Sequence, residues 1–342
     1  MRSAAHSLAI PRGRELAPRS ASSAARALLL LTLSIGAAAV EVHVAPGNWT
    51  DQVEAAGTGV VVVFAAGRYG GCSTGGLALA SGVALVGTSG AAATVIDCGG
   101  VGRHFAVEGG ASVRIEGLTL TGGAAAGAEG NSDGGCVLVA GYGGSVVVAD
   151  SVFSNCIATA RGGAIAVRGS AALNFSRSNF TGNRAGEGGG AIHADASTLH
   201  VSSSRFELNS AGTRGGAVAI TEGAVLDLSD ALFQSNRVLV AEHYETGVAG
   251  GGAIFARDGC STRVSGRSEF VDNTVPASTA DKGTGGGVSL WAESTLLVEG
   301  PATFVQNSAL YGGAVHAFDR SRSGPRSPRG KICERCLRDG CP

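Results

Sequence analysis

The sequence predicts an all-β fold in which the chain winds into a parallel β-helix of stacked coils. Three observations predict it. A Gly-Gly motif returns at nearly constant spacing, a Phe-x-x-Asn motif returns in phase with it, and the segments between them are short apolar runs separated by Gly, Ser or Asn. Alternating runs of this length are typical of strands rather than helices. A fixed period over many copies indicates a solenoid.

Composition is compatible with one folded solenoid domain. The chain has 342 residues, of which 56 are glycine, but glycine shows no three-residue period, which excludes collagen. The many short apolar runs argue against disorder. A length of 342 residues often means two domains, yet a solenoid core grows in one dimension and needs no division. The net charge of −1 gives no reason to expect a nucleic-acid partner.

The first repeated motif is Gly-Gly followed by a small residue and then Val or Ile. Copies begin at Gly134, Gly162, Gly189, Gly215, Gly251, Gly285 and Gly312, and uninterrupted copies lie 26 to 28 residues apart. Glycine permits the positive φ and the close backbone approach that a tight corner needs. We therefore expect one coil per copy, with three short strands and three turns in each.

The second motif is Phe-x-x-Asn, and each of its phenylalanines lies 17 to 19 residues after the preceding Gly-Gly. Its phenylalanines are Phe153, Phe180, Phe206, Phe233, Phe270 and Phe304, and its asparagines are Asn183, Asn209, Asn236, Asn273 and Asn307. After Phe153 the asparagine position holds Cys156. Coils stacked about 4.8 Å apart place equivalent residues above one another. We expect a file of stacked phenylalanines and a ladder of asparagine amides at one corner.

The region before residue 134 follows the same pattern less regularly. Expected strands are Val60–Phe64, Leu77–Leu79, Val83–Val86, Thr94–Ile96, Phe105–Val107 and a run from Val113 to Leu120. Asn48–Ala56 is expected to form a short helix that ends at Gly57 and covers the open first coil. The prediction is a right-handed, single-stranded parallel β-helix of about 10 or 11 coils, since parallel crossovers strongly prefer the right hand.

Both ends of the chain differ from the repeats. Residues 1–39 contain an apolar run, Ala27–Val40, preceded by arginines, which predicts a secretory signal; an organelle transit element is the alternative. Residues 40–319 are the expected β-helix, and 320–342 are an expected disordered, basic, cysteine-containing tail. We expect a secreted or cell-surface protein, associated with the outer membrane if bacterial, without a transmembrane span in the mature chain.

The paired GGA[IV] and FxxN repeats resemble those of the chlamydial polymorphic outer membrane proteins. Members of that family are autotransporter-type adhesins with a β-helical passenger. The stretch from Gly82 to Gly123 is similar to the broader pectin-lyase-like β-helix group. Together the two resemblances cover residues 42 to 318. The secretion barrel of the first family has no counterpart in this sequence, so the resemblance implies the fold and, as an expectation, adhesion.

No cluster typical of catalysis is evident in the sequence. Enzymes that act on acidic polysaccharides need grouped carboxylates, or Ca²⁺ with an arginine base, and no acidic group recurs on successive coils. His193 and His316 are expected in one outward column, but about 19 Å apart at the strand spacing, which is too far to share a metal. We expect no catalytic residue, no metal and no cofactor.

Two surface ion pairs are expected on the outward side of the coils. His193 and Asp195 point outward from one strand and should form a solvated pair. Arg168 and Asp195 should form an exposed salt bridge of little energetic weight.

Two insertions interrupt the period, at Arg237–Gly250 and Thr274–Thr284, each between an asparagine and the next Gly-Gly. They should leave the same corner on successive coils, and insertions gathered on one face often carry function in solenoids. The candidate binding patch is Glu242, His243, Tyr244, Glu245, Asp281 and Lys282. The alternative is that these are tolerated surface loops.

Cysteine spacing predicts one disulfide. Cys72 and Cys98 lie 26 residues apart, close to one coil, so their side chains should face each other across neighbouring strands. Cys136, Cys156 and Cys260 are expected to act as small buried residues.

The favoured function is non-catalytic recognition or adhesion, with a glycan or a cell-surface protein as partner. The alternative is a polysaccharide lyase or glycoside hydrolase that acts on acidic polysaccharide. A structural envelope component is the third possibility.

Overall fold

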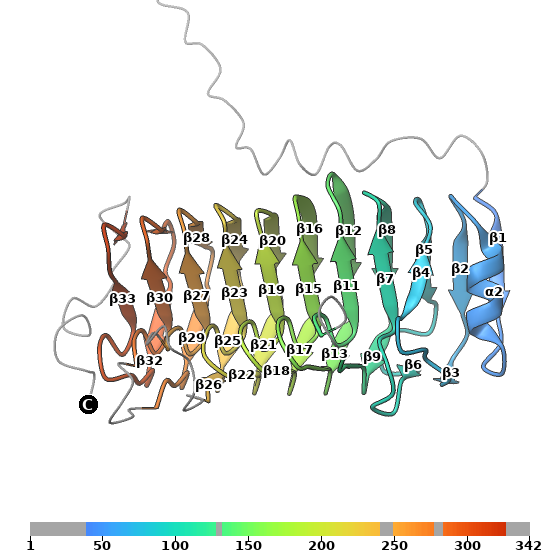
Figure 1. Cartoon of the computed structure of the whole chain (residues 1–342), viewed down its shortest axis with the longest axis horizontal. Helices are drawn as coiled ribbons and strands as arrows, with labels where there is room; N and C mark the ends of the chain where they lie inside the picture. Colours follow the sequence, from blue (N-terminus) through green and yellow to red (C-terminus); the bar gives the residue numbers. More distant parts are fainter. Residues whose placement is uncertain (1–38, 128–131, 240–248, 277–282, 326–342) are drawn as a thin grey trace, which may run out of the picture. The chain divides into compact units, whose positions relative to one another are not determined.

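A computed structural model describes residues 39–127, 132–239, 249–276 and 283–325. The chain divides into two compact units at residues 39 and 40, and only the second unit falls within these ranges. The expected signal segment and most of the expected tail therefore lie outside the described residues. The second unit is a stack of short strands in which neighbours always pair in parallel, as Figure 1 shows. The predicted parallel β-helix is confirmed.

Within the described ranges the strands form four parallel sheets, here named A to D. Sheet A contains β1 (Glu41–Val44), β2 (Val61–Phe64), β5 (Ala84–Gly87), β8 (Ser112–Glu116), β12 (Gly144–Ala149), β16 (Ala171–Ser176), β20 (Thr198–Ser202), β24 (Val225–Ser229), β28 (Ser261–Ser265), β31 (Thr295–Val298) and β34 (Arg322–Pro325). Sheet B contains β3 (Gly67–Tyr69), β6 (Thr94–Asp97), β9 (Thr119–Thr121), β13 (Val152–Ser154), β17 (Asn179–Thr181), β21 (Arg205–Glu207), β25 (Leu232–Gln234), β29 (Glu269–Val271) and β32 (Thr303–Val305).

The other two sheets complete each coil. Sheet C contains β4 (Leu77–Leu79), β7 (Phe105–Glu108), β11 (Val137–Ala140), β15 (Ile165–Arg168), β19 (Ile192–Asp195), β23 (Val218–Thr221), β27 (Ile254–Arg257), β30 (Val288–Trp291) and β33 (Val315–Ala317). Sheet D contains β10 (Ala124–Ala125), β14 (Ile157–Ala158), β18 (Arg184–Ala185), β22 (Ser210–Ala211) and β26 (Arg237–Val238).

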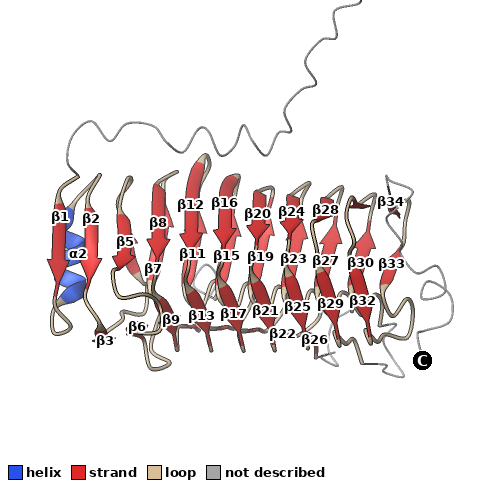
Figure 2. Cartoon of the chain, turned by 180° about the vertical axis from the view of Figure 1, so that it is seen from behind, coloured by secondary structure: helices blue, strands red, loops and turns tan. Residues whose placement is uncertain are grey.

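A middle coil runs through sheets C, A, B and D in that order, as Figure 2 shows for β15, β16 and β17. The fourth strand is an addition to the three that the sequence predicted. It is only two residues long, too short to show an alternating pattern. The expected run from Val113 to Leu120 also divides into two strands, because Gly117 between them adopts a positive φ of 65° and turns the chain.

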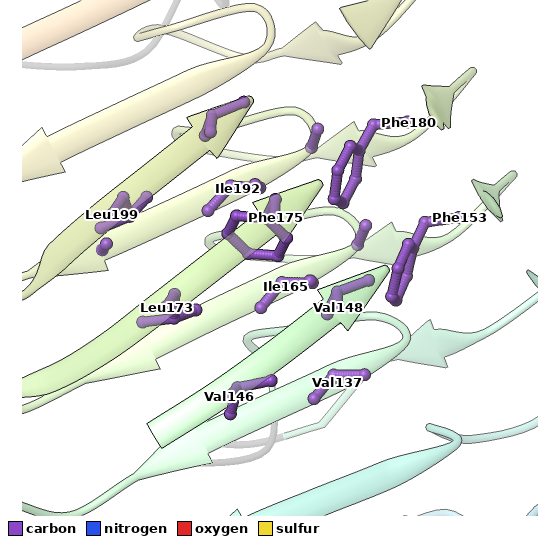
Figure 3. Close-up of a cluster of buried hydrophobic side chains, with 14 of the residues drawn as sticks. Val137, Val146, Val148, Phe153, Ile165, Leu173, Phe175, Phe180, Ile192 and Leu199 are labelled. Atoms are coloured by element: carbon purple, nitrogen blue, oxygen red, sulfur yellow. The ribbon is translucent and has the colours of Figure 1, made fainter. Parts of the chain in front are cut away.

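Phenylalanines fill the interior of the coils in one continuous file. Phe153, Phe180, Phe206, Phe233, Phe270 and Phe304 stack with ring centroids 4.6 to 5.0 Å apart and ring planes within 8° of parallel. Figure 3 shows the first two rings one above the other beside the aliphatic side chains of sheets A and C. The first five rings are completely buried. The file follows directly from the register that pairs each phenylalanine with its equivalent on the next coil.

Asparagines form a second file at the next corner. Each amide nitrogen donates to the Oδ1 of the next asparagine at 2.8 to 3.0 Å, from Asn183 through to Asn307. Each amide also donates to the backbone carbonyl of a phenylalanine in the preceding coil, and each Oδ1 accepts a backbone N–H as well. Buried amides satisfied in this way hold the corner together without contact with water.

The first coil is covered by α2 (Trp49–Ala56), which the sequence placed there. Trp49 and Val53 are buried on its inner face, and Gly57 ends it with a φ of 79°. The indole Nε1 of Trp49 donates to the carbonyl of Gly70 at 2.6 Å. The helix therefore closes an end at which stacked strands would otherwise expose their backbone edges.

Two disulfides lie near this end. Cys72 and Cys98 are joined, as their spacing predicted. The expectation that Cys136 and Cys156 are simple buried residues is wrong, because they form a second disulfide within a single coil. Cys260 is a buried free thiol, and burial raises its pKa to about 11.

The asparagine ladder should contribute strongly to stability. In Asn209→Ala, the amide and backbone N–H of Asn183 lose their acceptor, and the carbonyl of Phe180 loses a donor. Unsatisfied buried groups cost about 1–3 kcal/mol each, so we expect the free energy of unfolding in urea to fall by about 2–4 kcal/mol. The exposed Asn179→Ala is the control, and an equal loss in both variants would contradict a special role for the ladder.

Candidate functional site

The outer face of sheet C carries two buried ionisable side chains, His193 and Asp195. Its core side is lined by residues such as Ile192 and Ala194, and the alternate residues, such as His193 and Ala219, point away from that core. His193, Ala219, Phe255, Ser289 and His316 occupy one column on successive strands.

A second column runs beside the first, just before each Gly-Gly. Parallel bridges connect Arg161, Gly188, Arg214, Gly250, Thr284 and Tyr311 in that order. Because Gly188 has no side chain, it leaves a gap between the two arginines on the coils before and after it.

A pocket of about 60 Å³ occupies this gap. It is lined by Arg161, Glu187, Gly188, His193, Thr213, Arg214, Ala219, Thr221 and Phe255. The guanidinium of Arg214 lies 5.8 Å from the centre of the Phe255 ring, a cation–π distance. We name it the Gly188 pocket.

A network of ion pairs supports one side of this pocket. Asp133 is 1% exposed and accepts hydrogen bonds from the guanidiniums of Arg161 and Arg168. Burial alone would raise the pKa of Asp133, but the two arginines outweigh it and lower the pKa. Arg161 also donates to Asp195 at 3.2 Å, and so connects two buried carboxylates. The expected exposed Arg168–Asp195 bridge is corrected, because Arg161 bonds Asp195 and Arg168 bonds Asp133 in a buried network.

His193 and Asp195 also differ from expectation, because they form a buried pair rather than a solvated one. Their side chains are 8% and 12% exposed, and His193 Nε2 lies 2.8 Å from Asp195 Oδ1. Asp195 accepts a further bond from the hydroxyl of Thr221. Burial would raise the pKa of Asp195, but the bonds from His193 and Thr221 and the charge of Arg161 lower it to about 2.

The ionised Asp195 fixes which nitrogen of His193 carries the proton. Since the carboxylate can only accept, a neutral His193 must hold its proton at Nε2, and its lone pair lies at Nδ1. Nδ1 is buried and has no hydrogen-bond partner among the described residues. A buried acceptor without a donor is unfavourable, so a hydroxyl that reached it from the pocket would be bound well.

The pocket walls combine donors and acceptors. The two guanidiniums can donate to a ligand and the Glu187 carboxylate can accept from it, and His193, whose Nδ1 is buried, also lines the pocket. The hydroxyls of Thr213 and Thr221 already donate to the carbonyl of Glu187 and to Asp195, so towards a ligand they are acceptors. The lining carries two guanidiniums and one carboxylate, and Arg161 is already paired with the carboxylates of Asp133 and Asp195. The arrangement suits a small ligand with one anionic group and several hydroxyls.

The predicted patch of Glu242, His243, Tyr244, Glu245, Asp281 and Lys282 lies outside the described residues. The described ends of its two insertions do lie together, since Val238, Ala249 and Val275 form one small buried cluster. The N–H of Gly250, at the end of the first insertion, donates to the carbonyl of Thr213 at 3.1 Å. The insertion therefore ends beside the Gly188 pocket.

Sequence reasoning missed Arg161, Arg214, Glu187 and Phe255. One signal was available, because Arg161 and Arg214 both come directly before a Gly-Gly and so share one repeat position.

One further group of potential metal ligands occurs near the first coils. Cys72, Cys98 and His104 bring one ligand-type atom each within 4.8 Å of one another. Both sulfurs are used in the disulfide, so this group has no thiolate to offer. The cysteines of the tail, Cys333, Cys336 and Cys341, lie outside the described residues.

Known proteins resemble the chain in fold. A family described as "Right handed beta helix region" matches residues 81–309. A search of curated proteins gave no match. Within the described residues, no helix is long and apolar enough to cross a membrane.

Solved structures that match include three polysaccharide-acting enzymes. The catalytic domain of a GH87 α-1,3-glucanase in complex with tetrasaccharides shares 11% identity over 91% of this chain and 70% of that chain, with a TM-score of 0.38. The A-module of mannuronan C-5 epimerase AlgE4 from Azotobacter vinelandii shares 14% identity over 83% and 93%, with a TM-score of 0.33. The catalytic unit of a thermostable GH87 α-1,3-glucanase from Streptomyces thermodiastaticus shares 15% identity over 85% and 69%, with a TM-score of 0.34. Likenesses this distant carry no functional conclusion.

The Asp195 network should make stability depend on pH. A carboxyl whose pKa is lowered on folding stabilises the fold above its unfolded pKa, near 3.8, and this contribution disappears as the pH falls towards 2. We expect Asp195→Asn to lower the free energy of unfolding by roughly 2 kcal/mol at pH 7. In denaturant titrations, the difference in free energy of unfolding between wild type and variant should disappear as the pH falls from about 4 to about 2. The exposed Asp258→Asn is the control, and a gap for Asp195→Asn that did not vary with pH would be the contrary result.

Proposed function

We propose that this chain, which belongs to the family of right-handed β-helix proteins, binds an acidic polysaccharide along the outer face of sheet C. One acidic sugar unit occupies the Gly188 pocket. The observation that carries the proposal is the set of pocket walls, in which two guanidiniums accompany a carboxylate and a buried imidazole acceptor.

The charges of the walls support an anionic sugar. A carboxylate on the sugar accepts from Arg214, or from an N–H of Arg161 other than those donated to Asp133 and Asp195, since guanidiniums match the planar carboxylate group. Glu187 limits the net positive charge, so a ligand with one negative group per sugar is favoured over a highly charged one.

The acceptors in the pocket support a ligand with hydroxyl groups. His193 Nδ1 and Glu187 both need a donated proton, and a plain anion such as sulfate has none to give. Sugar hydroxyls both donate and accept, so a uronic acid can form hydrogen bonds with the donors and with the acceptors of the pocket. Phe255 adds an apolar surface for the C–H face of the ring.

Binding of a polysaccharide without its cleavage fits a role in adhesion or recognition. The Gly-Gly and Phe-x-x-Asn repeats resemble those of the chlamydial adhesins, and an acidic polysaccharide is a component of many cell surfaces. A location outside the cell or at its surface, which the N-terminal apolar run predicts, is part of this proposal.

A second candidate function is cleavage of the same polysaccharide, and the His193–Asp195 pair favours it. Asp195 orients the imidazole so that Nδ1 carries the lone pair that a general base needs. In a β-elimination, Nδ1 takes the proton from the carbon next to the sugar carboxylate. The C–H electrons form a carbon–carbon double bond, the bond to the departing sugar oxygen breaks, and that oxygen takes a proton from water.

Filling the pocket should abolish binding without unfolding the protein. A Cβ built at Gly188 lies 3.3 Å from the carbonyl oxygen of Arg214 and 3.6 Å from the Cβ atoms of Ala219 and Arg214. Since Gly188 has no positive φ, Gly188→Leu requires only a small shift of the Arg214 backbone and occupies the pocket. We expect calorimetry with oligogalacturonate to show at least tenfold weaker binding than in wild type, with an unchanged melting temperature.

The matched control is Ala172→Leu, which introduces the same side chain at an exposed position of sheet A. Neutral cello-oligosaccharides and inorganic sulfate are the comparison ligands. Equal binding of oligogalacturonate to Gly188→Leu and Ala172→Leu would refute the pocket, and tighter binding of cello-oligosaccharides would refute the acidic class.

Cleavage is tested by incubation of polygalacturonate and alginate with wild type and His193→Ala. A lyase gives new reducing ends together with unsaturated, ultraviolet-absorbing ends, and loss of the general base should slow it by about 10²–10⁴-fold. Binding without either product in wild type would leave recognition as the function and reject cleavage.

A further inference from the structure

We infer that the polysaccharide chain runs parallel to the solenoid axis and extends from the Gly188 pocket onto an aromatic platform. The platform consists of Trp291, Tyr311, His316 and Phe318. It binds the C–H faces of further pyranose rings, as a site separate from the pocket. This inference rests on the proposed function, and the experiment below separates the two.

The four rings come from two successive coils and form one surface. The ring centroids of Trp291 and Phe318 are 4.6 Å apart, and His316 lies 6.1 Å from Trp291 and 6.4 Å from Tyr311. The rings of His316 and Phe318 are within 12° of parallel. Such a group presents ring faces, whose negative charge density attracts the weakly positive C–H groups of a sugar.

Trp291 is held in position by a chain of hydrogen bonds. Its Nε1 donates to the hydroxyl of Ser289 at 3.0 Å, and that hydroxyl lies 2.9 Å from the hydroxyl of Thr284. Thr284 in turn donates to the carbonyl of Ala249 at 3.2 Å. A ring fixed in this way loses little freedom when a ligand stacks on it, which favours binding.

The platform is exposed although most aromatic residues of the described chain are buried. Phe318 and Tyr311 are 53% and 47% exposed, and Trp291 and His316 are partly buried. Burial lowers the pKa of His316, so this ring is neutral at neutral pH and can pack among the others. Exposed aromatic groups with polar edges, such as the Tyr311 hydroxyl, are typical of ligand surfaces that contact both apolar faces and hydroxyls.

His316 and Tyr311 continue the two columns that pass the pocket, and Trp291, which pairs with Arg257, lies in a third column beside them. Ala219, on the pocket floor, is two coil steps from Ser289 and three from His316 in one column. In the other, Arg214 leads through Gly250 and Thr284 to Tyr311. At about 4.8 Å per step, the platform begins about 10 Å from the pocket centre and extends to about 14 Å. A ligand that contacts both the pocket and the platform must therefore be a polymer, and it must run along the solenoid axis.

The test measures how affinity grows with chain length. Oligogalacturonates from the disaccharide to the octasaccharide are titrated into wild type, Trp291→Ala and Phe318→Ala by calorimetry. The shortest ligands reach only the pocket, so all three proteins should bind them equally. For the longest ligands, wild type should gain affinity and each variant should bind about tenfold more weakly. Trp291→Phe, which keeps an aromatic face, should recover most of the loss.

Tyr142→Ala removes an exposed aromatic group away from both columns and is the matched control. If the platform variants bind long ligands as wild type does while Gly188→Leu binds none, the platform is wrong and the proposed function stands. If none of the proteins binds an oligogalacturonate of any length, the result contradicts the proposed function itself. If Trp291→Ala instead changes the oligomeric state in sedimentation, the rings form an interface between two copies of the chain, and the sugar platform is rejected.

Discussion

Parallel stacking of equivalent residues is the constraint on which the rest of the structure depends. In a file of equivalent residues, a polar group turned inwards meets the same group one strand away, so its neighbours in the file can complete its hydrogen bonds. Asparagine can do this because its amide both donates and accepts. Serine does so at a different corner, where Ser178 Oγ donates to the carbonyl of Ser176 and accepts the N–H of Ser151. Phenylalanine meets the same requirement for apolar residues, because its flat rings stack on one another at the strand spacing.

The same constraint explains how a site forms on the outside. Residues that are about 27 positions apart in sequence become neighbours, so the pocket draws Arg161, His193, Arg214 and Phe255 from four different coils. Outward positions do not have to match one another, and they are free to carry different chemistry on each coil. A glycine in a column of larger residues, such as Gly188, is then sufficient to open a pocket.

Most of the fold could be predicted from the sequence because it depends on residues that repeat. Phe180 and Asn183 recur with the same partners, so their spacing alone determines their files. The disulfide between Cys136 and Cys156 was missed because its residues are 20 apart and belong to one coil, whereas the prediction compared neighbouring coils. The burial of His193 and Asp195 was missed for another reason. It depends on Arg161 and Thr221 from adjacent coils, which no period reveals.

The asparagine ladder has a consequence for how such a protein changes in evolution. Every interior asparagine receives and gives the same bonds, so duplication or loss of one complete coil in the middle preserves the contacts of the ladder on either side. The two ends of the ladder differ from its middle. At the N-terminal end Cys156 replaces asparagine and is bonded to Cys136, and at the other end Asn307 has no further asparagine to donate to within the described residues. Coil number can therefore vary in steps of about 4.8 Å without redesign of the core. The length of the outer face then changes by whole coils, and with it the length of polymer that the face can contact.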